Sequence, residues 1–102
     1  MRVKVTSRAE TDLDEIGERI AERNPLRAIT FVQELRQRCS RIADLPHAGS
    51  PRPQWGEGIR IVVYGKYLIV YRVRDDAVQV LRIVHGARNL DTLFMKEPPP
   101  DN

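Results

Sequence analysis

The most constraining feature of this 102-residue chain is a pair of almost continuously apolar segments, residues 59–64 and 67–73, separated only by Gly65-Lys66. Short segments rich in β-branched and aromatic residues, joined by a two-residue turn that contains glycine, predict a β-hairpin. Because polar residues rarely alternate with apolar ones along these strands, much of both faces of the hairpin must be covered. The rest of the chain must therefore supply elements that pack on this sheet.

Two further strands are predicted. Residues 2–6 alternate Val3 and Val5 with polar neighbours, which is the period of a short strand. Residues 78–84 form a third run of mainly apolar residues after the hairpin, and residues 74–77 are predicted to be the turn before it.

Two amphipathic helices are predicted between the first strand and the hairpin. The first begins at Ser7 with a capping-box pattern. Asn24 and Pro25 suit the N-cap and first position of the second. The apolar stripes are Ala9, Leu13, Ile16 and Ile20 on the first helix, and Ala28, Phe31, Leu35, Cys39, Ile42 and Leu45 on the second. The acids of the first helix are expected on a solvated face; they are Asp12, Asp14, Glu15 and Glu18.

The predicted order is β-α-α-β-β-β, an α+β domain with a helical hairpin packed on a small antiparallel sheet. Residues 46–58, rich in proline and glycine, are expected to form an ordered loop in which Trp55 covers the edge of the core. We expect a single domain over residues 1–96 and a flexible, proline-rich tail over residues 97–102.

Composition narrows the function only slightly. A net charge of +3 is compatible with an acidic or nucleic-acid partner but does not select one. The single cysteine, Cys39, cannot form an internal disulfide and is expected to be a packed thiol in a reducing cytoplasm. Neither a signal peptide nor a membrane span is apparent, and no Cys/His spacing suggests a metal or cofactor site.

Candidate functional side chains gather near the exit of the last strand. His85 could act as a base, or it could simply bind a backbone carbonyl. Arg88 could bind a phosphate or carboxylate of a target, or it could pair with Asp91. The tyrosines of the hairpin are expected to pack across strands rather than to stack on bases; they are Tyr64, Tyr67 and Tyr71.

Six segments occur together in a fixed order over residues 3–94. They are A-E-T-D-L-D-E-I from Ala9, N-P-x-x-A from Asn24, L-P-x-x-G from Leu45, G-I-R from Gly58, Y-L-I-V-Y-R-V from Tyr67 and L-R-I-V-H-G-A-R-N from Leu81. With these segments the chain resembles the RelE/ParE superfamily of bacterial toxin–antitoxin toxins, and more closely its ParE branch. The resemblance implies a toxin neutralised by a ParD-like antitoxin encoded beside it.

The superfamily contains two mechanisms on one fold, so the fold alone does not decide between them. RelE-like members cut mRNA on the ribosome, whereas ParE-like members poison DNA gyrase. Ribonuclease members carry a catalytic arginine at the position of Leu68 and a tyrosine at that of Phe94. Leucine and phenylalanine supply neither a proton nor a cation for RNA cleavage. The resemblance therefore implies a gyrase inhibitor without catalytic residues, with a ribosome-dependent mRNA endonuclease as the alternative.

The resemblance also suggests roles for the arginines. His85 and Arg88 are candidates to face the target, and Arg60, Arg72 and Arg82 are candidates to bind the antitoxin. Arg72 and Arg82 could instead pair with helix carboxylates, and Arg60 could form an ion pair at the sheet edge. Direct nucleic-acid binding without the antitoxin is not expected. A third hypothesis is a degenerate member that binds only its antitoxin and co-regulates their operon.

Overall fold

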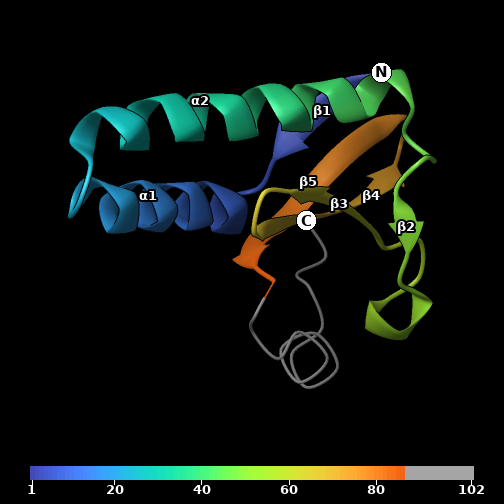
Figure 1. The fold of residues 1–102 in the computed structure, drawn as a ribbon. Helices are drawn as coiled ribbons and strands as arrows, with labels where there is room; N and C mark the ends of the chain where they lie inside the picture. The colour runs from blue at the N-terminus through green and yellow to red at the C-terminus, as the bar shows by residue number, and fades with distance from the viewer. Residues whose placement is uncertain (87–102) are drawn as a thin grey trace.

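The computed structural model describes residues 1–86 and confirms the α+β class and the order of the predicted helices and strands. It adds a short strand and a 3-10 helix within residues 46–58, which were predicted to form a loop. Both helices lie side by side on one face of the sheet (Figure 1). The elements are β1 (Arg2–Val5), α1 (Ser7–Ala21), α2 (Pro25–Arg41), the 3-10 helix η1 (Ile42–Asp44), β2 (Ser50–Pro51), the 3-10 helix η2 (Pro53–Trp55), β3 (Arg60–Tyr64), β4 (Tyr67–Arg74) and β5 (Ala77–His85). The tail predicted at residues 97–102 and the boundary at residue 96 lie outside the described residues.

The sheet has five strands in the order β1-β5-β4-β3-β2, and it is mixed rather than antiparallel. β1 runs parallel to β5, with Val3 opposite Val78, whereas every other pair is antiparallel. The antiparallel prediction was therefore wrong for β1. Alternation of apolar residues predicts that a strand exists, but its neighbour depends on where the chain returns after the helices and the hairpin.

The two hairpin turns are both two residues long. Tyr64 pairs with Tyr67 across Gly65-Lys66, as predicted, and Gly65 has the positive φ of 58° that this turn requires. The next turn is shorter than predicted, because β4 extends to Arg74 and β5 begins at Ala77. Asp75 and Asp76 form it with φ values of 54° and 58°, a conformation that aspartate tolerates better than most residues.

Helix starts are fixed by side-chain caps. α1 is capped by Thr6 rather than Ser7, since the Thr6 hydroxyl accepts a hydrogen bond from the Ala9 N–H at 3.2 Å. The same hydroxyl lies 2.9 Å from the Val80 carbonyl and so ties the helix start to β5. α2 begins as predicted, with the Asn24 side chain accepting from the Arg27 N–H at 3.0 Å.

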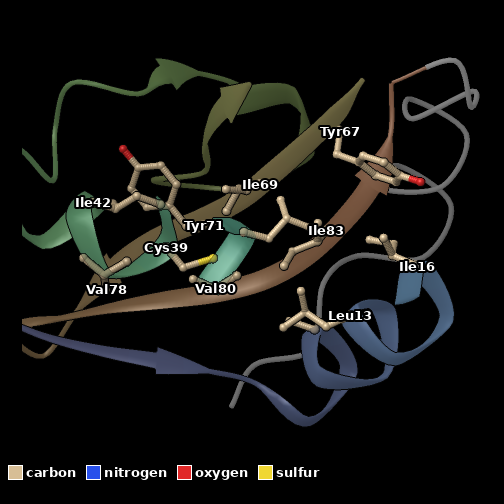
Figure 2. Close-up of a cluster of buried hydrophobic side chains, with 12 residues drawn as sticks. Leu13, Ile16, Cys39, Ile42, Tyr67, Ile69, Tyr71, Val78, Val80 and Ile83 are labelled. Carbon is tan, nitrogen blue, oxygen red and sulfur yellow. The ribbon is translucent and has the colours of Figure 1, made fainter. Parts of the chain in front are cut away.

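The main core lies between the helices and the sheet (Figure 2). Leu13 and Ile16 of α1 and Cys39 of α2 pack against strand residues that include Tyr71 and Ile83. Cys39 is buried, which confirms the predicted packed thiol, and this burial raises the pKa of the thiol to about 11.

A second apolar cluster forms on strand residues outside the main core and includes the loop residue Trp55. Trp55 is buried, which confirms its predicted position over the core edge. A bulge in the β4–β5 pairing places Val70 opposite Arg82 and Tyr71 opposite Val80, which leaves Leu81 as an extra residue. Leu81 packs in the second cluster, while Arg82 reaches α1.

Candidate functional site

Arg82 is held inside the protein by Asp12 of α1. Its Nε and Nη2 donate to the two carboxylate oxygens of Asp12 at 2.9 and 3.2 Å, and only 9% and 5% of the respective side chains are exposed. Asp12 Oδ2 also accepts the backbone N–H of Ile83 at 2.9 Å. Because β1 ends at Val5, no described strand continues along the β1 side of β5 at this point, and the carboxylate supplies the missing acceptor.

The prediction of a solvated face is therefore wrong for Asp12. Its spacing already contained the signal, because Asp12 lies three residues after Ala9 and four before Ile16, on the apolar stripe of α1. A carboxylate buried at such a position is costly unless it is paired, and Arg82 supplies the paired cation. This geometry makes Arg82 a structural residue and gives no support to its predicted contact with the antitoxin.

Arg60 and Tyr71 fix the loop that precedes β2. Arg60 Nη1 donates to the Gly49 carbonyl at 2.8 Å. The arginine therefore binds the backbone of the loop, whereas the alternative considered from the sequence was an ion pair with an acidic side chain. The Tyr71 hydroxyl donates to the Pro46 carbonyl at 2.8 Å and accepts the Gly49 N–H at 3.1 Å. A side chain on Gly49 would collide with that hydroxyl, which explains the glycine of the L-P-x-x-G segment.

Arg72 is also buried, and its Nε donates to Gln79 Oε1 at 3.2 Å across the β4–β5 pair. The three arginines chosen for antitoxin binding thus occupy different surroundings and do not form one basic face. Their roles toward an antitoxin stay predictions.

His85 ends β5 opposite Tyr67 of β4, and the two rings meet edge to face with centroids 5.3 Å apart. The space beside them, bordered by Glu15 and Arg19 of α1, measures about 30 Å³, room for about one water molecule. Arg88, the other candidate for target contact, lies outside the described residues, and so do Asp91 and Phe94.

Leu68 occupies the position at which the resemblance places a catalytic arginine in ribonucleases. It is half-buried, sits opposite Val84 and packs against the second apolar cluster. Of the hairpin tyrosines, Tyr67 packs across strands on His85 as predicted. Tyr64 and Tyr67 also pack on Phe31 of α2, each with centroids 5.7 Å apart, a contact between sheet and helix that was not predicted.

An apolar groove of about 540 Å³ separates α1 from α2, and sequence reasoning missed it. Small residues on both helices create it, including Gly17, Ala21 and Ala28. Its rim carries acids from α1, namely Asp14 and Glu18. On α2, Leu26 and Ile29 are 78% and 59% exposed.

Within residues 1–86, no helix is long and apolar enough to cross a membrane. The same residues contain no group of three or more His, Cys, Asp or Glu side chains that could hold a metal ion.

Comparison with known proteins identifies the family. Residues 3–90 match the family model described as the ParE toxin of the type II toxin–antitoxin system parDE. A solved structure described as the chromosomal ParDE TA system from P. aeruginosa is similar, with 26% identity and a TM-score of 0.72 over 83% of this chain and 95% of that chain. No curated protein matches significantly. The chain therefore belongs to the ParE toxin family of type II toxin–antitoxin systems.

Proposed function

We propose that this protein is a cytoplasmic, single-domain toxin that inhibits DNA gyrase without cutting RNA and is silenced by a ParD-like antitoxin. Membership of the ParE family supports the toxin role. The observation that carries the choice of mechanism is Leu68, an apolar side chain packed against an apolar cluster where an RNA-cleaving relative would need a cation.

The surroundings of His85 support the same choice. RNA cleavage by a 2′-hydroxyl requires a proton acceptor, a donor for the leaving oxygen and cations near the phosphate. The His85 ring packs edge to face on Tyr67, and Leu68 provides no cation. These features favour a toxin that acts by binding its target.

The groove between α1 and α2 supports an antitoxin that binds the helical hairpin. Leu26 and Ile29 of α2 are exposed, and Ile29 lines this groove. Covering these apolar side chains with a partner would remove them from water, which is favourable. We expect an antitoxin segment, disordered when free, to wrap the hairpin and sheet and to bury more than the ~1,600 Å² of a standard interface.

The test is to induce the chain in cells, alone and together with the product of the adjoining reading frame. Growth, chromosomal DNA breaks and mRNA integrity are measured in the same cultures. We expect arrest with DNA breaks and intact mRNA, and rescue by the co-expressed partner. Rapid mRNA cleavage without DNA breaks would overturn the gyrase assignment. A lack of binding between the purified proteins at micromolar concentration would overturn the antitoxin assignment.

Arg88→Ala tests the proposed target surface. We propose that Arg88 is exposed after the last strand, where an arginine contributes only ~0–1 kcal/mol to stability, so the variant should fold but lose toxicity. Arg2→Ala, which removes an exposed arginine from β1, is the matched control and should remain toxic. If folded Arg88→Ala is fully toxic, the target surface lies elsewhere.

A further inference from the structure

β3 is only partly covered along its outer edge. β2 pairs with Arg60 and Ile61, and no other described strand pairs with the remainder of β3 on this side. The Arg52 N–H donates to the Ile59 carbonyl at 2.8 Å, so the backbone groups of Ile59 face outward. Along an antiparallel strand, the backbone N–H and C=O groups of successive residues point to opposite sides. The backbone groups of Ile61 and Val63 therefore point outward like those of Ile59. Ile61 lies opposite Ser50, but Val63 faces the open edge.

The loop that leads into β2 does not cover Val63, because it is held in another place. The chain leaves the sheet at Gly49, whose N–H is bonded to the Tyr71 hydroxyl and whose carbonyl is bonded to Arg60. Between this loop, the end of α2 and Val62 lies a recess of about 230 Å³. The open edge therefore adjoins a space that an added side chain could enter.

The charges around this recess favour an acidic partner. Arg38 and Arg41 of α2 line it together with a single acid, Asp44. α2 passes along the edge, because Glu34 accepts a hydrogen bond of 2.6 Å from the Tyr64 hydroxyl and Arg38 follows one turn later. A second copy of this chain would bring further arginines to the same place, whereas an acidic segment would neutralise them.

We propose that the edge of β3 at Val63 receives an extended acidic segment of the antitoxin as an added strand. This inference rests on the proposed function and specifies how the antitoxin binds. Val62 packs toward the helices, whereas Val63 is 62% exposed. Because side chains alternate along a strand, the segment should direct acids toward Arg38 and Arg41 and apolar residues over Val63.

Backbone hydrogen exchange tests the added strand directly. NMR is recorded on the free chain and on its complex with the purified product of the adjoining reading frame. The Val63 amide should exchange rapidly in the free chain and at least about tenfold more slowly in the complex, since it gains a backbone acceptor. The Val62 and Tyr64 amides, which face β4, should be protected in both states. A complex in which Val63 still exchanges at the free rate overturns the proposal.

Val63→Pro removes the outward N–H and leaves the inner hydrogen bonds of β3 to β4 intact, since proline is tolerated on strand edges. It should weaken binding at least about tenfold relative to the matched variant Val63→Thr, which keeps the N–H. Chemical shifts of the core of each variant verify the fold. Equal affinities of the two folded variants contradict an added strand.

Charge reversal tests the choice of an acidic segment. The double variant Arg38→Glu, Arg41→Glu should bind at least about tenfold more weakly and with less salt dependence. The control is Arg2→Glu, Lys4→Glu, which makes the same charge change on β1 at the opposite sheet edge and should bind normally. Equal losses in both variants contradict the acidic site.

Protection of the Val63 amide when the chain alone is concentrated would identify a second copy as the occupant and overturn the proposal. Absence of binding by the unmodified chain would contradict the proposed function itself.

Discussion

Replacing Asp12 by alanine should destabilise this protein more than replacing any other acid of α1. The substitution removes both carboxylate oxygens that bind Arg82, whose side chain is 9% exposed, and with them the oxygen that accepts the Ile83 N–H. Breaking a buried ion pair from one side costs about 3–5 kcal/mol, because the remaining charge has neither a partner nor water. That is a large part of the ~5–15 kcal/mol that holds a typical domain together.

Urea denaturation followed by circular dichroism measures this loss. Asp14→Ala is the matched control, because Asp14 lies on the same helix but is exposed, and it should change stability by no more than ~0.5 kcal/mol. The paired replacement Asp12→Leu, Arg82→Met removes both charges and should recover much of the loss, since apolar pairs often replace buried ion pairs. An Asp12→Ala protein within about 1 kcal/mol of the unmodified chain would refute the reasoning.

Three further predictions concern stability and reactivity. Asp76→Gly should stabilise the protein by about 0.5–1 kcal/mol, because Asp76 has a φ of 58°, and an unchanged melting temperature would contradict this. Gly49→Ala should destabilise it by about 1–3 kcal/mol through collision with the Tyr71 hydroxyl; wild-type stability in urea would show that the loop can move away. Cys39, with its pKa raised by burial to about 11, stays protonated as pH rises through the ordinary thiol range, so it should resist alkylation near about pH 8 until urea unfolds the chain. Rapid alkylation of the native protein would contradict that burial.

The sequence predicted the features that depend on neighbouring residues. The Asn24-Pro25 corner and the Gly65-Lys66 turn were correct because caps and tight turns need particular residues at fixed offsets. The burial of Cys39 followed from its position on the apolar stripe of the second helix, whereas that of Trp55 was expected from its large apolar ring within an ordered loop.

The features that sequence reasoning missed join distant parts of the chain. The parallel pairing of β1 with β5 spans about 70 residues or more. Pairing of Arg82 with a helix carboxylate was one of the alternatives considered, but the sequence did not show that the partner is the buried Asp12, 70 residues away. The bulge at Leu81 also escaped prediction, because the strand pattern alone does not fix how many residues oppose one another. At the candidate site, the sequence placed His85 at the strand end but did not predict its contact with Tyr67.

The central claim is the choice of gyrase inhibition over RNA cleavage, and purified components test it most directly. The toxin is added to DNA gyrase acting on plasmid DNA and, in parallel, to ribosomes translating a defined mRNA, with and without the antitoxin. With Leu68 packed against an apolar cluster, we expect inhibited supercoiling or accumulated cleaved DNA, intact mRNA, and full reversal by the antitoxin. Codon-phased cuts in the mRNA with gyrase unaffected would contradict the account and establish the ribonuclease alternative.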